Sequence, residues 1–200
     1  WLSGDLDWAS DLYRRAANAS LVDAQQDGRR QGIYAPIAMH VLGAAWMAND
    51  RELLDQVGGT IDESCKTLIQ NVDLTPEPLF NATLHLTRIR VAWFTGRGDT
   101  LTKTIPDLDR AVRSLDRWGQ WYWEGERDIH THTVVKALLE RKADAVKSGL
   151  VKYDEYLTEQ RGTSPTISEL VDEEFISFAS TAQDLGIVLP KFETLLLPLR

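Results

Sequence analysis

The sequence predicts an all-α protein built from packed helical hairpins, arranged as an open superhelix or as part of an (α/α) toroid. Three observations predict this fold. Apolar residues recur at three- and four-residue spacing through most of the 200 residues. Alternating runs of β-branched residues bounded by turn pairs, which indicate strands, do not occur. Residues 44–68 align without gaps onto residues 91–115, a shift of 47 that indicates a duplicated hairpin.

The first two predicted helices have clear starts. One follows Asp50, carries the unfavourable pair Gly58-Gly59 near its middle, and turns inward Leu53, Leu54, Val57, Ile61 and Leu68. The other begins at Thr75-Pro76, where a threonine N-cap precedes a proline in the first turn. Its inward residues are Leu79, Ala82, Leu86, Ile89 and Trp93, and Gly96-Arg-Gly-Asp99 ends it.

Three further apolar stripes follow. Pro106 lies near the start of the next predicted helix, whose stripe is Leu108, Ala111, Val112 and Leu115. Another stripe runs through Val134, Val135, Leu138, Leu139 and Val146. The last helix starts at Ser164-Pro165, ends at Gly186, and buries Val171, Phe175, Phe178, Ala182 and Leu185. We expect a hairpin body over residues 1–162 and a C-terminal helix with an apolar tail over residues 163–200, packed together as one domain.

The internal alignment predicts what each hairpin contains. The identical pairs are Ala45/Ala92, Trp46/Trp93, Leu54/Leu101, Asp62/Asp109 and Leu68/Leu115. Each copy has a helix ending in Ala-Trp, a polar corner and a second amphipathic helix. One such hairpin does not bury its apolar stripe alone, so copies stack on one another, as in tetratricopeptide-type superhelices and closed toroids.

Charge and composition exclude several function classes. The net charge of −8 disfavours binding to a nucleic acid backbone. Nine acids lie between Asp154 and Glu193 against only Arg161 and Lys191, which predicts a solvated helix face or an acidic docking surface. The apolar stretch over residues 35–48 is shorter than a membrane span and is interrupted by His40.

A few residues bear on the compartment in which the protein is found. A single cysteine, Cys65, excludes an internal disulfide and favours the cytoplasm over secretion, whereas Asn18-Ala-Ser20 and Asn81-Ala-Thr83 match the glycosylation pattern. Cys65 falls on a predicted apolar stripe, so we expect a buried, inert thiol. Because the chain opens on Trp1, we expect a trimmed or excised fragment.

The candidate functional residues gather between positions 118 and 132. Aromatic rings beside carboxylates suit a sugar-binding cleft, and a carboxyl group with a raised pKa could act as a general acid. The candidate catalytic acids are Glu124, Glu126 and Asp128, and the candidate ligand-binding residues are Trp118, Trp121, Trp123, His130 and His132. The alternative is an inter-helix loop whose tryptophans fill the core.

Asp128-Ile-His-Thr-His132 resembles the first metal motif of amidohydrolase-type barrels, in which two histidines on a strand face one metal. That family needs a preceding strand and further ligands on a β/α barrel, and the 68 residues that follow the motif here are predicted as helix. We therefore expect structural histidines, with no metal and no cofactor.

Two family resemblances extend these expectations. Met39-His-Val-Leu-Gly-Ala-Ala-Trp46, Val91-Ala-Trp-Phe-Thr-Gly-Arg-Gly-Asp99, Trp121-Tyr-Trp123 with Thr133-Val-Val-Lys-Ala-Leu-Leu139, and Tyr156-Leu-Thr-Glu-Gln-Arg-Gly162 resemble (α/α) toroids such as the thioester domain of bacterial alpha-2-macroglobulin-like proteins. The thioester motif is absent, because Cys65 is followed by Lys-Thr-Leu-Ile-Gln70, so covalent trapping is not implied. The segment Ala179-Ser-Thr-Ala-Gln-Asp-Leu-Gly-Ile-Val-Leu-Pro190 resembles the C-terminal helical domain of ketopantoate reductase relatives.

The expected function is a non-catalytic helical-repeat module that binds a peptide or protein partner, since hairpin repeats without a catalytic constellation usually do this. One alternative is a toroid enzyme or ligand-binding domain acting on a carbohydrate or another small molecule through residues 118–132. A second is a helical dimerisation or substrate domain of a larger dehydrogenase. The oligomeric state is left open by the sequence.

Overall fold

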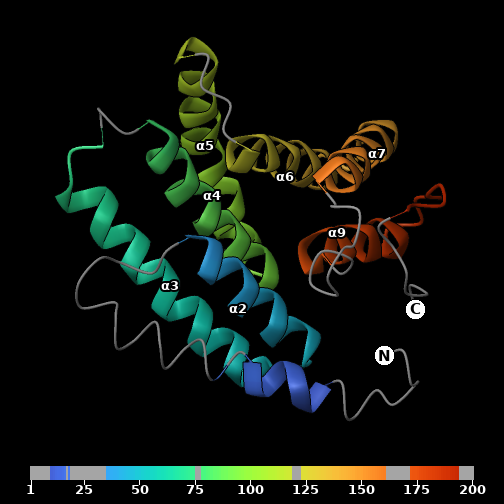
Figure 1. Ribbon diagram of the computed structural model, residues 1–200, viewed down its shortest axis with the longest axis horizontal. Coiled ribbons are helices and arrows are strands. Elements are labelled where there is room, and N and C mark those ends of the chain that lie inside the picture. The colour runs from blue at the N-terminus through green and yellow to red at the C-terminus, as the bar shows by residue number, and fades with distance from the viewer. Residues whose placement is uncertain are drawn as a thin grey trace. The chain divides into compact units, whose positions relative to one another are not determined.

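The computed structural model (Figure 1) describes residues 10–16, 18, 35–74, 78–118, 123–160 and 172–193. All regular structure in these ranges is α-helical, which confirms the predicted all-α class. Residues 10–16 are helical and precede α2 (Ala35–Met47), α3 (Arg51–Asn71), α4 (Pro78–Phe94), α5 (Gly98–Trp118), α6 (Trp123–Leu139), α7 (Ala143–Gln160) and α9 (Glu173–Asp184). None of the described helices combines the length and apolarity that crossing a bilayer requires.

The chain forms two compact units. Residues 1–120 carry α2–α5, and residues 121–200 carry α6, α7 and α9. In the first unit α2 contacts both α3 and α4, and α4 packs along α5. In the second unit α6 packs along α7, and α9 contacts both of them. The predicted division at residue 162 falls in the segment 161–171, outside the described residues, and stays a prediction.

Three pairs of consecutive helices, α2–α3, α4–α5 and α6–α7, are joined by turns of the same length. Each turn has three residues, and its middle residue adopts a left-handed backbone. The φ angles are 53° at Asn49, 69° at Gly96 and 52° at Arg141. Glycine and asparagine adopt this conformation at low cost, whereas arginine does not, so only the first two turns are visible in the sequence.

Backbone hydrogen bonds close these turns. After α4 the Arg97 N–H donates to the Ala92 carbonyl over 2.7 Å, and after α6 the Lys142 N–H donates to the Ala137 carbonyl over 3.0 Å. Such bonds satisfy carbonyls that the end of a helix leaves without a partner. The chain therefore reverses within three residues and keeps part of the backbone hydrogen bonding that a helix end would otherwise lose.

The helix ends in the first unit carry the same offset as the internal sequence alignment. The helices α3 and α5 begin at residues 51 and 98 and end at residues 71 and 118, while α2 and α4 end at residues 47 and 94. Each pair of ends is 47 residues apart. The aligned residues Asn49 and Gly96 share the left-handed conformation, so the equivalence extends to the backbone of the turn.

The core of the first unit contains side chains from α2, α3 and α4. The predicted inward residues of α3 are buried in it, namely Leu53, Leu54, Val57 and Ile61, and Leu68, Trp46 and Trp93 pack against it partly buried. Cys65 belongs to the same core. Its predicted burial is confirmed. Burial, together with the nearby Asp62 carboxylate, raises the pKa of its thiol to about 12, which disfavours the reactive thiolate at neutral pH.

An ion pair at the edge of this core joins α3 to α4. Arg88 Nε donates to Asp62 Oδ1 over 2.9 Å, and Lys66 Nζ lies 2.8 Å from Asp62 Oδ2. Burial acts to raise the pKa of Asp62, but the hydrogen bonds from Lys66 and Arg88 outweigh it and the net pKa is lowered. A lowered pKa means that this carboxylate stabilises the fold at neutral pH and loses that contribution in acid.

The prediction for the last helix is wrong at its start. Asp172 is the N-cap of α9, which begins at Glu173, so no single helix runs from Ser164-Pro165 to Gly186. Leu185, predicted as buried, is 41% exposed because it lies after the end of α9.

Two further boundary predictions are wrong. Helix α5 begins at Gly98, so Pro106 lies inside it rather than near its start. A proline inside a helix costs about 3 kcal/mol, but the buried Leu101, Leu108 and Ala111 flank it on the same helix and outweigh that cost. The stripe from Val134 to Val146 spans two helices, since the turn at residues 140–142 separates α6 from α7.

The pair Gly58-Gly59 in α3 has two different environments. A Cβ atom built on Gly58 would lie 2.8 Å from Thr95 Cγ2 and 3.2 Å from Val91 Cγ1, both in or just after α4. The Thr95 hydroxyl donates to the Val91 carbonyl over 2.6 Å, which fixes the rotamer of Thr95. A Cβ atom on Gly59 would meet nothing within 4 Å. Gly58 therefore permits the close approach of α3 and α4, while Gly59 only weakens the helix.

We expect opposite effects from alanine at these two positions. Gly58→Ala should lower the free energy of unfolding by about 1–3 kcal/mol, because Thr95 and Val91 must move. Gly59→Ala should raise it by up to about 1 kcal/mol, because alanine has the higher helix propensity. Urea denaturation of the two variants and the parent chain measures both shifts. Changes of the same sign would contradict the assignment.

Candidate functional site

The tryptophan-rich segment that the sequence singled out runs from the end of α5 into α6. Residues 123–132 form the first turns of α6 and are not an inter-helix loop. Residues 119–122, which include Trp121, lie outside the described residues. The same holds for five side chains whose backbone is described, namely those of Trp118, Trp123, Glu124, Glu126 and Asp128. The assignment of a ligand or a catalytic step to these side chains stays a prediction.

His130 and His132 are described, and both lie on α6. Residues two positions apart on a helix point about 200° apart around its axis, so the two imidazoles diverge, unlike two histidines on a strand. The His130 ring stacks on Tyr153, with centroids 5.8 Å apart, and lies 5.3 Å from Tyr156. Within the described ranges, no three His, Cys, Asp or Glu side chains are grouped so as to hold a metal ion.

A buried polar cluster joins the three helices of the second unit. Thr131 of α6 and Tyr153 of α7 donate hydroxyl hydrogen bonds to Glu174 Oε2 of α9, over 3.1 Å and 3.0 Å. Arg127 of α6 lies 2.6 Å from Asp172 Oδ2 and 3.7 Å from Glu174 Oε2. The carboxylate of Glu174 is therefore the point at which α6, α7 and α9 meet.

The Arg127 guanidinium keeps its charge at neutral pH. Burial acts to lower the pKa of Arg127, but Asp172, Tyr153 and Glu174 outweigh it and the pKa is raised well above the ordinary value. Asp172 is also the N-cap of α9, where Oδ1 accepts the Phe175 N–H over 2.7 Å. One aspartate thus begins α9 and pairs with the buried arginine of α6, which fixes the position of α9 on the unit.

Glu173 lies beside this cluster at the start of α9. Its pKa is raised from 4.5 to about 7, because burial and the neighbouring Asp172 and Glu174 carboxylates outweigh the Arg127 charge and a backbone hydrogen bond. Glu173 therefore takes up a proton close to neutral pH, although Asp172 and Glu174 have the arginine as a counter-ion.

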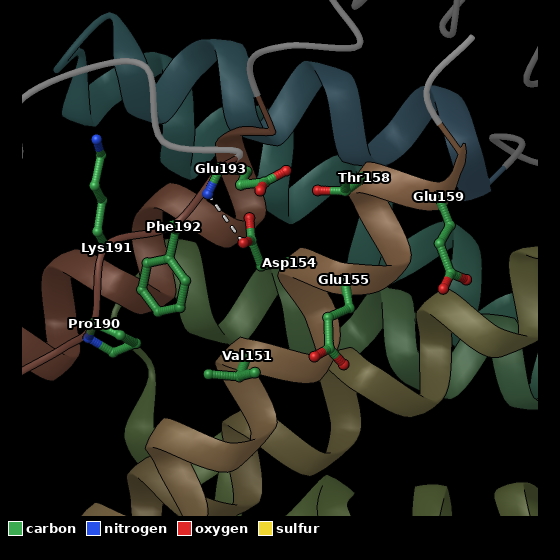
Figure 2. Close-up of a pocket in the computed structure, with 9 residues that line it drawn as sticks. All are labelled: Val151, Asp154, Glu155, Thr158, Glu159, Pro190, Lys191, Phe192 and Glu193. Atoms are coloured by element: carbon green, nitrogen blue, oxygen red, sulfur yellow. Dashed lines mark hydrogen bonds between the residues drawn. The ribbon is translucent and has the colours of Figure 1, made fainter.

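A pocket of about 480 Å³ lies between α7 and the chain that follows α9 (Figure 2). Its lining is Val151, Asp154, Glu155, Thr158, Glu159, Pro190, Lys191, Phe192 and Glu193. Four of these residues carry carboxylates and one carries an ammonium group, so the lining has a net charge of −3. Figure 2 shows the polar ends of Asp154, Thr158 and Glu193 converging, while Lys191 extends away from them. The pocket is accordingly an acidic one with an apolar wall.

Two contacts hold residues 190–193 against α7. The Glu193 N–H donates to Asp154 Oδ2 over 3.0 Å. The Phe192 ring meets Phe175 edge to face at 5.1 Å, and Phe175 meets Tyr153 edge to face at 5.6 Å. Because Tyr153 also binds Glu174, the wall of the pocket is connected directly to the buried polar cluster.

Part of the lining is free to bind a ligand. Neither Glu155 nor Glu159 forms an ion pair or side-chain hydrogen bond within the described part of the chain, and the two are four residues apart on an exposed face of α7. The buried hydroxyl oxygen of Thr158 has no hydrogen-bond partner among the described atoms. A donor with positive charge would satisfy these groups together.

The sequence indicated the acidity of this region but not the pocket. The excess of acids between Asp154 and Glu193 was equally compatible with a solvated face. The folding of residues 190–193 back onto α7 depends on Phe192 and on one backbone N–H, and neither has a sequence pattern.

Comparison of the chain with known protein families, curated proteins and solved structures finds no match. Functional inference for this chain therefore rests on its own geometry and charge.

Removal of the buried arginine tests the polar cluster. Arg127→Met should lower the free energy of unfolding by about 3–5 kcal/mol, because Asp172 and Glu174 would stay buried without a counter-ion. Adding Glu174→Gln should recover part of this loss, because one uncompensated charge disappears. Arg113→Met, at an exposed position of α5, is the matched control and should change stability by about 0.5 kcal/mol or less. Chemical denaturation gives all three values, and a cost at Arg127 equal to that of the control would rule out the cluster as a tie between helices.

The raised pKa of Glu173 predicts that the free energy of unfolding depends on pH. Its pKa is higher in the folded chain, about 7, than the ordinary 4.5, so the folded state binds the extra proton between these values. The stabilisation that comes from this stronger proton binding is fully present below pH 4.5 and is lost as the pH rises through 7. Glu173→Gln should therefore stabilise the protein at pH 8 by up to about 3 kcal/mol and change little at pH 4. Urea denaturation at both pH values tests this, and an equal effect at each would exclude titration of Glu173 as the cause.

Proposed function

We propose that this chain is a helical-hairpin protein that binds a basic segment of a protein partner in the acidic pocket formed by α7 and residues 190–193. The observation that carries the proposal is that Glu155 and Glu159, beside a cavity of about 480 Å³, have no ion-pair partner in the described part of the chain. Carboxylates without a counter-ion attract a cationic partner and speed its association.

The lining favours arginine or lysine side chains that alternate with apolar residues. Val151 and Phe192 offer an apolar wall on which the hydrocarbon part of a long basic side chain can pack. The Thr158 hydroxyl oxygen and the Glu155 and Glu159 carboxylates supply acceptors for its N–H groups. A basic peptide thus satisfies the charged and the apolar parts of the pocket together.

The architecture supports a binding module. Three hairpins in the described residues share a three-residue turn with a left-handed middle residue, and two of them also share the 47-residue offset of the sequence. We infer that the hairpins are structural repeats. Stacked hairpin repeats offer extended surfaces for partner chains.

The alternative of a toroid enzyme depends on Glu124, Glu126 and Asp128, whose side chains lie outside the described residues. A helical domain of a dehydrogenase would need a nucleotide-binding domain elsewhere. Neither alternative has a described contact in its favour, whereas the peptide-binding function has the pocket.

Fluorescence anisotropy with a labelled peptide of alternating arginine and leucine tests the proposal on the full chain. We expect saturable binding that weakens as salt is added, because the contacts are electrostatic. Glu155→Gln and Glu159→Gln should each weaken binding about five-fold, which corresponds to roughly 1 kcal/mol. The control is Asp184→Asn, which removes the same charge from an exposed position outside the pocket.

Two results would contradict the proposal. One is equal weakening by Asp184→Asn and by the pocket variants, which would indicate attraction to the net charge alone. The other is equal affinity for a peptide with glutamine in place of every arginine.

A further inference from the structure

A second groove lies at the other end of α7. Its volume is about 340 Å³, and it is lined by Arg141, Ala143, Lys147, Leu185, Gly186, Ile187 and Val188. The turn between α6 and α7 supplies one side, and the chain just after α9 supplies the other. The left-handed residues Arg141 and Gly186 lie in these two segments and fix their direction.

The two basic side chains of this groove have no counter-ion among the described residues. Neither Arg141 nor Lys147 forms an ion pair or side-chain hydrogen bond within the described ranges of the chain, and the lining contains no acid. Nearby Lys142, by contrast, pairs with Glu140 over 2.7 Å. The groove therefore has two positive charges that are available to a ligand.

The opposite side of the groove is apolar and open to solvent. Val188 is 79% exposed and Leu185 is 41% exposed, while Ile187 is buried beneath them. Val188 has the highest exposure among the large apolar residues that the structure describes. An apolar surface next to unpaired charges is typical of a binding face, where a partner covers the apolar atoms and neutralises the charges.

We propose that this groove binds an acidic peptide segment that also carries apolar side chains. Charge complementarity selects the acid, because Arg141 and Lys147 attract carboxylates and repel a basic chain. The exposed Leu185 and Val188 select an apolar side chain beside it, since covering them removes apolar surface from water.

This groove is independent of the acidic pocket and of the function proposed for it. The two sites share α7 but no lining residue, and their charges have opposite sign. A basic peptide and an acidic peptide should therefore bind without displacing each other.

Backbone amide NMR of the full chain tests the proposal with three capped peptides. The first is acetyl-Asp-Leu-Asp-Leu-amide, the second replaces both aspartates with asparagine, and the third replaces both leucines with glycine. Only the first should shift the amides of residues 141–147 and 185–188 in a saturable manner. Arg141→Gln and Lys147→Gln should each weaken it about five-fold, and Lys152→Gln, which removes an exposed charge from α7 outside the groove, should leave it unchanged.

Each alternative outcome overturns a defined part of the proposal. If the asparagine peptide bound as tightly as the first, Arg141 and Lys147 would not discriminate carboxylates from amides. If the glycine peptide bound as tightly, the exposed Leu185 and Val188 would not be a docking surface. Absence of any shift with the first peptide, or equal weakening by Lys152→Gln, would exclude the groove as the site. Loss of arginine-leucine peptide binding in the acidic pocket would leave this result unaffected.

Discussion

The fold depends on one backbone constraint, a left-handed residue at the middle of a three-residue turn. It occurs at Asn49, Gly96 and Arg141, and in each case it lets two consecutive helices pack against each other. After α4 and α6 a backbone hydrogen bond across the turn also satisfies a carbonyl near the helix end. Because the turn has a fixed length, it also sets which faces of the two helices meet. The apolar stripes on those faces are then buried between them, and this burial is the main stabilising contribution.

Buried charge decides how the second unit is held together. Its three described helices meet at the Glu174 carboxylate, which Arg127, Thr131 and Tyr153 neutralise or hydrogen-bond. Such a cluster adds little net stability, because desolvation of the charges offsets their attraction. It does tie the helices together, since Thr131, Tyr153 and Glu174 come from α6, α7 and α9 and meet at one carboxylate. That arrangement places Phe175 and Phe192 in contact and so builds the acidic pocket.

The two candidate sites lie at opposite ends of α7. Arg141, in the turn before α7, and Lys147, near its start, line a groove with exposed apolar residues, whereas Glu155 and Glu159, near its end, line the acidic pocket. The chain that follows α9 contributes to both sites, through residues 185–188 and 190–193. One short segment therefore completes two binding surfaces of opposite charge, which suits a module that contacts a partner through more than one segment.

The sequence by itself determined the all-α class, the burial of the α3 stripe and Cys65, and the turn at Gly96, because helical periodicity and glycine at a left-handed position are local properties. It did not show the turn at Arg141, where an unfavourable residue is imposed by the packing of α6 on α7, nor the start of α5 ahead of Pro106, where burial of Leu101 and Leu108 outweighs the cost of proline. Tertiary structure alone decided which acids and bases are paired. Asp172 and Glu174 face Arg127, which lies 45 residues before Asp172 in the sequence. Glu155 and Arg141, by contrast, have no ion-pair partner in the described chain. Pairing depends on distances in space, which no local pattern encodes, and it is the unpaired charges that give this protein its two candidate binding sites.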